Sequence, residues 1–355
     1  MKKKTKIGLG LLILAILGGV YFQDKVLLLF ASGKTTVNKN QIDFYIKKTS
    51  TLADLAENLI ENKIIDDAAT FVAIGEYKEL TPQRIALGKY QIKPKTPLKT
   101  LLNGFTINSK GNGNAEVEVT STFNICDNIY EVAGKATQNI MADSSMLVDY
   151  LLNPELLKKY GFTVETLPSL FFPNSYNMFW DTNEEEFVAR MAQEYKKFWT
   201  SDRKEKLQRL GLTSQSDLTT IASIVYKEQN RVEEEWGIIG RLYLNRVKDN
   251  WLLQSDPTFK FCWGDKLDGV KRLTYKHREV DCPYNTYKYP GLPPGPICVP
   301  PAKVLDAILN AAPHNYYFMC AKPGYSGYHN FANGINEHNR NAKIYQNWLT
   351  KENIR

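Results

Sequence analysis

The stretch TTIASIVYKEQNRVEEEWGIIGRLYLNRVKDNWLLQSDP, residues 219–257, decides how the rest of the chain is interpreted. Its first half carries three aliphatic residues and one acid at the helical positions i, i+3, i+4 and i+7: Ile221, Ile224, Val225 and Glu228. Upstream, Ser214 and Asp217 have the spacing of a capping box, which marks a helix N-terminus. The pattern predicts an amphipathic helix that begins after residue 214 and carries a carboxylate on its apolar side.

Glu228 is the residue in this stretch that is best suited to acid catalysis. Burial disfavours the ionised form of a carboxyl group, so an acid on an apolar helix face should have a raised pKa. A carboxylic acid that stays protonated near neutral pH is what general acid catalysis requires. The alternative is that Glu228 marks the end of the buried stripe and points into water. Helical spacing alone does not decide between the two.

The composition describes an ordinary folded protein. The chain has 355 residues, enough for two or more domains, and a formal net charge of +7. Part of that charge lies in four lysines at the extreme N-terminus: Lys2, Lys3, Lys4 and Lys6. No motif that reads DNA or RNA accompanies them, so nucleic acid is not an expected partner. Aromatic residues are abundant, which suits either a core or the platforms that bind sugar rings.

The N-terminus predicts a membrane anchor. Residues 7–22 contain no charged side chain, and a second apolar patch follows at 26–30. The uncharged run is shorter than the ~20 residues of a full span, but flanking lysines can extend it by snorkelling. A cleaved signal peptide would begin similarly, yet no clear cleavage site is present. We therefore expect a cytoplasmic tail at 1–6, an uncleaved transmembrane helix at 7–30, and a body in the periplasm, outside the inner membrane.

Metal, cofactor and thiol chemistry receive no support from the motifs. The four histidines and five cysteines form no HExxH or CxxC pattern, and no glycine-rich phosphate loop or GxSxG elbow occurs. We expect no metal and no cofactor. Cys262 and Cys282 form a possible disulfide in an oxidising compartment, but buried free thiols are an equal alternative.

The fold class is predicted as α+β, in several parts. Residues 42–107 give strand, helix, helix and strand in order, a β-α-α-β unit that resembles a LysM-like module, although a spacer domain would have the same pattern. A turn-rich boundary follows at 108–114, and 115–200 is either a second LysM-like copy or a connecting lobe. Residues 201–355 form the predicted catalytic domain, of mixed α/β structure.

Local patterns give further expectations for the second half of the chain. A helix is expected at 184–199, and after the 215–228 helix another at 235–247. Residues 254–257 should be extended, because the residue before a proline avoids the helical region. The remaining expectations are a structured loop at 167–181, a proline-rich loop at 284–301, a helix at 303–311, a strand at 316–321, a loop at 324–331 and a helix at 337–348.

With metals and nucleophiles set aside, a carboxylate among aromatic and amide groups remains, which suits a glycan-cleaving site. The candidate acids are Glu228, Glu233, Glu234, Glu235 and Asp256. The run from Glu233 to Glu235 is typical of a solvated helix start, and Asp256 is typical of a turn before proline. Glu228 is therefore the preferred acid.

Five motifs, in this order, resemble the endolytic murein transglycosylase family, also called MltG or YceG-like. They are ASIVYKE (222–228), LYLNRV (242–247), LQSDPT (253–258), PYNTYKYPGLPPGPI (283–297) and GYHNFA with EHNRNA (327–342). The likeness covers nearly the whole chain from the anchor on. The family usually has ASIVEKE, so Tyr226 replaces the first of two glutamates and leaves Glu228, the position that the family uses for catalysis. Pro168 and Ser169 replace a common Glu-Gly pair, which puts any role for an acid there in doubt.

The resemblance implies a peptidoglycan lytic transglycosylase. Glu228 would protonate the glycosidic oxygen between N-acetylmuramic acid and N-acetylglucosamine, then help the 6-hydroxyl to attack, leaving a 1,6-anhydro end. The implied partners are glycan strands, their synthases and the membrane. The candidates for sugar contact are Asn245, Gln254, Asp256, Asn285, Tyr287 and His329. Each has loop bracing as an equal alternative, and Arg246 is expected to pair with an acid such as Glu235.

Two rival functions stay open at this point. One is a muramidase that hydrolyses the same bond and leaves reducing ends. The other is a scaffold without catalytic activity that binds peptidoglycan through the LysM-like unit. In the transglycosylase, Glu228 should lie at the floor of a cleft whose walls are the 254–257 and 284–295 segments.

Overall fold

The computed structural model describes residues 33–354, apart from positions 39, 48–49, 110, 112, 114–116, 268–269 and 271–273. The predicted anchor at 7–30 lies outside the described residues. Within the described part of the chain, no helix has the length and apolar character needed to cross a membrane. The chain divides into two compact units, the first mainly residues up to 120 and the second mainly residues from 121. Both contain helices and strands, so the predicted α+β class is confirmed.

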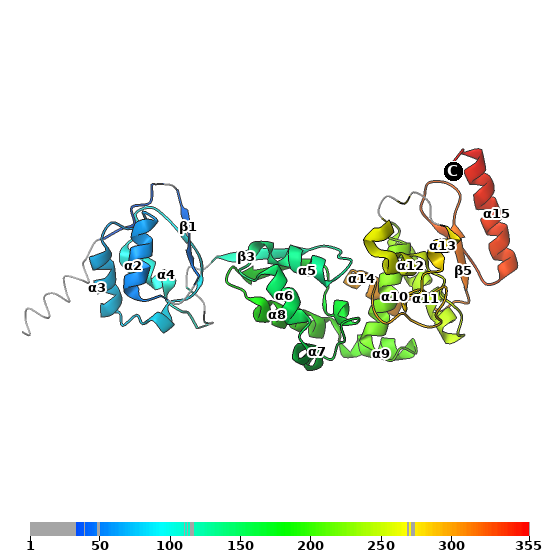
Figure 1. Ribbon diagram of the computed structural model, residues 1–355, viewed down its shortest axis with the longest axis horizontal. Coiled ribbons are helices and arrows are strands. Elements are labelled where there is room, and N and C mark those ends of the chain that lie inside the picture. The colour runs from blue at the N-terminus through cyan, green and yellow to red at the C-terminus, as the bar shows by residue number, and fades with distance from the viewer. Residues whose placement is uncertain are drawn as a thin grey trace, which may run out of the picture. The chain divides into compact units, whose positions relative to one another are not determined.

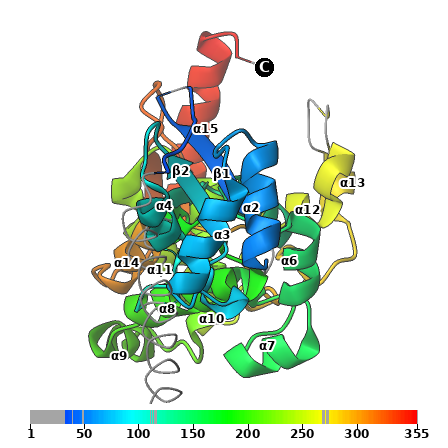
Figure 2. The same cartoon turned by 90° about the vertical axis from the view of Figure 1, so that its left-hand side faces the viewer.

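The first unit contains the predicted strand, helix, helix and strand in that order (Figure 1). Its elements are β1 (Ile42–Ile46), α2 (Leu52–Glu61), α3 (Ala68–Tyr77), β2 (Gly88–Ile92) and α4 (Leu98–Phe105). The strands β1 and β2 lie side by side (Figure 2). They pair antiparallel, with Phe44 opposite Tyr90. A cluster of buried side chains from both strands and all three helices forms the core.

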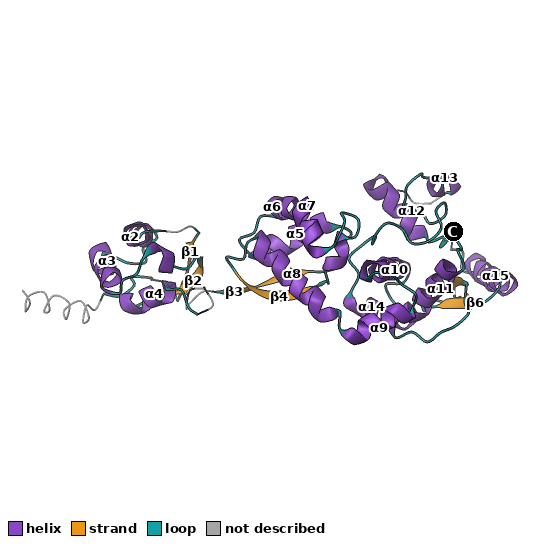
Figure 3. Cartoon of the chain, turned by 90° about the horizontal axis from the view of Figure 1, so that it is seen from below, coloured by secondary structure: helices purple, strands orange, loops and turns teal. Residues whose placement is uncertain are grey.

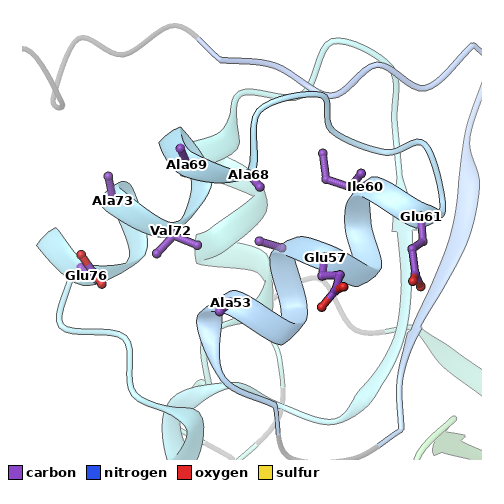
Figure 4. Close-up of a pocket in the computed structure, with 10 residues that line it drawn as sticks. Ala53, Glu57, Ile60, Glu61, Ala68, Ala69, Val72, Ala73 and Glu76 are labelled. Carbon is purple, nitrogen blue, oxygen red and sulfur yellow. The ribbon is translucent and has the colours of Figure 1, made fainter.

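A groove of about 710 Å³ opens between α2 and α3. Figure 4 shows small apolar side chains along it, with three glutamates at its edge. The residues that line it are Ala53, Ala56, Glu57, Ile60, Glu61, Ala68, Ala69, Val72, Ala73 and Glu76. None of the predicted site residues is among them.

The first part of the second unit is mostly helical. Its helices are α5 (Ile129–Ala136), α6 (Ser144–Leu151), α7 (Pro154–Tyr160) and α8 (Glu184–Phe198). The strands β3 (Glu118–Phe123) and β4 (Asn174–Phe179) pair in a two-stranded sheet, of which residues 118–120 and 177–179 belong to the first unit. The prediction of a loop over 167–181 was therefore wrong in part, because Tyr176 and Met178 alternate into the buried side of β4. The predicted helix at 184–199 is confirmed, with a capping box at Asn183.

The core of the second unit lies between α10 (Gln215–Glu228), α11 (Trp236–Lys248) and α14 (Ala302–Leu309), which Figure 3 shows grouped together. The helix α9 (Ser201–Arg209) packs beside them. Gly240 allows α11 to approach α14 closely, because a Cβ atom at that position would lie 2.5 Å from Ile308. The three predicted helices in this region are confirmed, to within a few residues at their ends.

The remaining elements surround that helical core. They are α12 (Asp256–Trp263), α13 (Tyr275–Arg278), β5 (Phe318–Ala321), β6 (His329–Ala332) and α15 (Ile335–Lys351). Short 3-10 helices cover Pro82–Arg84, Thr137–Asn139, Leu167–Leu170, Glu233–Glu235 and Gly264–Leu267. The loop predicted at 324–331 was wrong at its end, since β6 begins at His329 and pairs antiparallel with β5. The predicted final helix is present and longer than expected.

A disulfide joins Cys262 in α12 to Cys282 in the segment before Tyr284. Of the two alternatives that the cysteine pattern allowed, the structure has the bonded one. Cys126 and Cys298 are buried free thiols, and Cys320 is a partly buried free thiol. The bond ties the segment around Asp256 to the segment around Asn285, both of which contain candidate site residues.

Candidate active site

The helix α10 places the candidate acid. The side chain of Ser214 accepts a hydrogen bond from the Asp217 backbone N–H at 3.1 Å, and the Asp217 carboxylate accepts one from the Ser214 N–H at 2.8 Å. This predicted capping box fixes where the helix begins. The face that carries Ile221, Ile224 and Val225 is completely buried. Glu228 is the last residue of the helix, at the end of that face.

Two hydroxyl groups hold the carboxyl group of Glu228. The Tyr243 hydroxyl donates to Oε1 at 3.0 Å, and the Ser255 Oγ donates to the same oxygen at 2.5 Å. No described side chain donates to the second oxygen, Oε2. One oxygen is thus anchored by the protein, and the other is available to a bound molecule.

Burial raises the pKa of Glu228, although the residue as a whole is only half-buried. Loss of water around the carboxyl group is the largest cause, and the nearby charge of Asp256 acts in the same direction. The hydrogen bonds from Ser255 and Tyr243 lower the pKa, as does His329, but burial outweighs them. The interpretation that Glu228 simply points into water was wrong.

Tyr243 is itself almost completely buried on α11. Desolvation raises the pKa of its phenol well above the ordinary value, so the hydroxyl stays neutral and serves as a donor to Glu228. Ser255 is fully buried, and its backbone N–H donates to the Thr286 hydroxyl at 3.0 Å. Both groups that hold Oε1 are therefore fixed by the surrounding core.

The segment of Gln254 and Ser255 turns sharply before α12. Gln254 has a φ of 51°, and its N–H donates to the Thr286 carbonyl at 3.1 Å. Ser255 is extended, but Asp256 is already the first residue of α12, with Pro257 in its first turn. The prediction that 254–257 is extended throughout was wrong, because proline is well tolerated in the first helical turn, where its missing N–H has no partner to lose.

Asp256 forms part of a small polar cluster. It accepts a hydrogen bond from the Tyr287 hydroxyl, and Arg278 lies 3.3 Å from its Oδ1. The Arg278 guanidinium also lies over the Tyr287 ring, 4.8 Å from its centroid. Burial, followed by the contact with Asp256, raises the pKa of Tyr287. These contacts fix the carboxyl group of Asp256 beside Glu228.

A cavity of about 220 Å³ brings several of these groups together. The residues that line it are Glu228, Leu242, Tyr243, Arg246, Leu253, Gln254, Asp256 and Met319. Three predicted site residues thus share one cavity: Glu228, Gln254 and Asp256. Of the two predicted walls, the 254–257 segment contributes lining residues. The 284–295 segment contributes none. It contacts the site through Thr286, which accepts hydrogen bonds from the Gln254 and Ser255 backbone N–H groups, and through Tyr287, which donates to Asp256.

Asn245 and Asn285 lie outside the lining of this cavity. The Asn245 amide donates to the His314 carbonyl at 2.9 Å and to the Tyr316 carbonyl at 3.1 Å. The Asn285 side chain is fully buried and donates to the Arg278 carbonyl at 2.8 Å. In this structure both amides brace loops around the site, which is the alternative that the sequence left open for each.

The side chains of Glu235 and His329 contact each other. The exposed fraction of Glu235 is 3%, and its Oε2 lies 2.7 Å from the His329 Nδ1. The expectation that Glu235 is solvated was therefore wrong, as was its pairing with Arg246. Arg246 instead donates to backbone carbonyls, to Tyr317 at 2.8 Å and Leu253 at 2.7 Å.

Sequence reasoning missed the two groups that hold Glu228. Tyr243 lies in the helix predicted at 235–247 but received no role in the site. Ser255 lies between two candidate residues in LQSDPT and received no role. Only their position within the family motifs could have indicated a role in the site. A hydroxyl that contacts an acid 27 residues earlier leaves no periodic pattern in the sequence.

No metal centre is evident in the described part of the chain. The described histidines, cysteines and acids form no group of three or more that could hold a metal ion. The described polar groups around the cavity are two carboxyl groups, a guanidinium, an amide and two hydroxyl donors. This set can transfer a proton to and from a neutral polar substrate.

Known proteins resemble the chain over most of its length. An endolytic murein transglycosylase from Bacillus subtilis is 26% identical over 343 residues, covering 93% of this chain and 91% of the relative. One from Streptococcus pneumoniae is 22% identical over 357 residues, covering 93% of this chain and 62% of the relative.

The fold also has a solved counterpart. The crystal structure of a YceG-like protein from Listeria monocytogenes superimposes with a TM-score of 0.51 at 22% identity, covering 85% of this chain and 99% of that one. The sequence model of the YceG-like family matches residues 44–344. That match spans the cavity, Glu228 and every residue that holds it, and the chain therefore belongs to the YceG-like family.

Proposed function

We propose that the protein is an endolytic lytic transglycosylase of peptidoglycan. The observation that carries the proposal is the state of Glu228, whose pKa is raised by burial and whose Oε2 alone is available to a ligand. The names of the Bacillus subtilis and Streptococcus pneumoniae relatives support the same activity. The substrate is the β-1,4 bond between N-acetylmuramic acid and N-acetylglucosamine, within a glycan strand.

The first step uses Glu228 as the acid. The proton on Oε2 passes to the glycosidic oxygen, and the bond between that oxygen and the anomeric carbon breaks. Tyr243 and Ser255 remain on Oε1 and stabilise the carboxylate that forms. The N-acetylglucosamine side leaves with a free hydroxyl group.

The second step uses the same carboxylate as the base. It accepts the proton of the muramyl 6-hydroxyl while that oxygen bonds to the anomeric carbon, which closes the 1,6-anhydro ring. Glu228 is protonated again at the end, and no water is consumed. One acid serves both steps, so the reaction needs no second catalytic carboxylate.

The other polar groups of the site have supporting roles in this proposal. Gln254, Asp256 and Arg246 line the cavity and contact the sugars. Tyr287 holds Asp256, and His329 contacts the substrate from β6. Asn245 and Asn285 brace the loops that carry these groups.

The cellular setting belongs to the proposal too. Residues 7–30 anchor the chain in the inner membrane, with the body in the periplasm, and the LysM-like first unit binds the glycan strand. Cleavage of nascent strands beside their synthases would end strand elongation and so set strand length. The lysine cluster before the apolar run supports this orientation.

A muramidase is the second candidate, because Asp256 shares the cavity with Glu228 and provides a second carboxylate. The experiment that separates the two is digestion of purified sacculi in water enriched in ¹⁸O, followed by mass analysis of the products. Anhydro ends without ¹⁸O support the transglycosylase. Reducing ends that carry ¹⁸O would establish the muramidase, and absence of any product would favour a binding scaffold.

A further inference from the structure

His329 lies on the side of its hairpin that faces the cavity. In the β5–β6 register, Met319 is opposite Phe331, and Ala321 is opposite His329. Directly opposed residues of an antiparallel pair share a face, as do residues two apart on one strand. Met319 lines the cavity, so His329 projects from the same face.

Three donors converge on the buried carboxylate of Glu235. Its Oε1 accepts the His329 backbone N–H at 2.7 Å. Its Oε2 lies 2.7 Å from His329 Nδ1 and accepts the Gln229 Nε2 at 2.9 Å. The two oxygens of a carboxylate offer acceptor positions for all three. The contacts therefore offset the cost of burying its charge.

Gln229 cannot turn its amide around to relieve this arrangement. Its Oε1 accepts backbone N–H groups from Arg231 at 3.1 Å and Val232 at 3.2 Å. Its Nε2 must therefore face Glu235 and the Gly327 carbonyl, which it reaches at 2.8 Å. Because Gln229 directly follows Glu228 in the chain, the two acids are held in one rigid frame.

The network decides which nitrogen of His329 carries the proton. Nδ1 faces an acceptor, so in the neutral ring the proton lies on Nδ1 and Nε2 has a free lone pair. Nε2 makes no hydrogen bond to any described residue, while 17% of the side chain is exposed. In a neutral ring of this tautomer, Nε2 is free to accept a hydrogen bond from a bound molecule.

We propose that Glu235 is a positioning residue, which holds His329 so that its Nε2 accepts a hydrogen bond from a sugar hydroxyl in the Glu228 cavity. The inference rests on the proposed function, since it assigns His329 a defined contact with the same substrate. Glu235 touches no substrate and acts through the imidazole. Through its contact with His329, Glu235 connects the site to the 3-10 turn before α11. The other two acids of that turn face water.

Substitution of Glu235 by glutamine tests the idea with almost no change in shape. A glutamine has one acceptor oxygen where three donors converge, and its NH₂ group faces the donors instead. His329 can relieve this by moving its proton to Nε2, with Nδ1 accepting from the new amide. The ring would then offer a donor to the sugar where the native protein offers an acceptor. Glu234→Gln is the matched control, because Glu234 lies in the same turn and is exposed.

Two measurements follow on the full-length protein in detergent. Imidazole ¹⁵N NMR at a pH where the ring is neutral should show His329 protonated at Nδ1 in the native protein and at Nε2 in Glu235→Gln. With soluble glycan strands as substrate, Glu235→Gln should raise KM about tenfold and change kcat little, as loss of one hydrogen bond in both ground and transition states predicts. Glu234→Gln should match the native protein in both measurements.

A double-mutant cycle gives the decisive comparison. If Glu235 acts through His329, then Glu235→Gln should cost nothing further in a His329→Gln background. An equal loss in both backgrounds, or an unchanged ¹⁵N spectrum in Glu235→Gln, would overturn the proposal, and thermal unfolding identifies a variant that merely fails to fold. The NMR result needs no turnover, so it stands even if the native protein releases no anhydro ends, which would sink the proposed function alone.

Discussion

Two hollows in the described part of the chain, one in each unit, differ greatly in character. The groove between α2 and α3 measures about 710 Å³, and the cavity at Glu228 about 220 Å³. Small apolar side chains line the groove, and its only ionisable residues are three glutamates at the edge: Glu57, Glu61 and Glu76. The smaller cavity contains carboxyl, guanidinium, phenol and amide groups from three different segments. Catalysis depends on such convergence of polar groups on one point. The polar lining of a hollow is therefore a better guide to the active site than its volume.

The largest expected difference between the two hollows comes from matched substitutions of their acids. Glu228→Gln keeps the shape of the side chain but removes the proton donor, so release of anhydro ends should fall about 10²–10⁴-fold. Glu57→Gln in the groove should leave the rate unchanged, because Glu57 is exposed and has no part in the proposed chemistry. Product release from sacculi measures both. Full activity in folded Glu228→Gln would refute the assignment of the acid.

The disulfide offers a second way to separate the units, because all five cysteines lie at position 126 or beyond, outside the β1–α4 segment. Replacing Cys262 and Cys282 with serine frees a loop closed over a separation of 20 residues. The expected cost is about 3 kcal/mol of unfolding free energy for the second unit. Hydrogen exchange in the full chain should show faster exchange in α12 peptides.

The same experiment contains its own control. Peptides from α2 and α3 should exchange at the native rate in the double serine variant and in dithiothreitol. Faster exchange there would show that the disulfide also stabilises the helices of the groove. It would contradict the prediction that only the second unit depends on the bond.

How far the sequence predicts this site depends on whether a residue's partners are near it in the chain. Glu228 could be found, because its helix carries an apolar stripe and a capping box within fourteen residues of it. The placement of Gln254 and Asp256 in the same cavity followed from motif resemblance. The helices around them were also predictable, since their cores and caps are local patterns.

Glu235 shows what local patterns cannot supply. Three consecutive glutamates before a helix are typical of a solvated first turn, and Glu233 and Glu234 are indeed exposed. Glu235 is buried because its partner, His329, lies 94 residues later in the chain. Ser255 is a similar case, since its hydroxyl contacts Glu228 only after the chain turns sharply at Gln254. Such long-range partners require the folded structure.

A smaller effect is expected from the two groups that hold Oε1. Tyr243→Phe removes a hydrogen bond that stabilises the ionised form of Glu228, so the pKa of Glu228 should rise further. The acid would then stay protonated to higher pH, and the alkaline limb of the pH–rate profile should move upward. The maximal rate should fall about tenfold, as loss of one hydrogen bond to a charged group predicts.

The pH profile of product release checks this, with Tyr77→Phe, which alters an exposed tyrosine of α3, as the control. A limb that moves to lower pH in Tyr243→Phe would contradict the electrostatic role of the phenol. An unmoved limb with a reduced rate would limit Tyr243 to packing.

The smallest expected effect is on the stability of Glu228→Gln. The substitution that lowers the rate should raise the unfolding free energy. Because the folded state raises the pKa of Glu228, it retains a proton that the unfolded chain has lost over the window between the two pKa values. The unfolding free energy therefore falls as pH rises through that window, and the penalty is fully present above it.

Glu228→Gln cannot titrate, so above the window the variant should be about 1 kcal/mol more stable, roughly 2–4 °C in Tm. Below the window the two proteins should converge, and Glu57→Gln should follow the native curve throughout. Parallel native and Glu228→Gln curves at every pH would mean that the cavity does not destabilise the charge, which is the physical basis on which it differs from the groove.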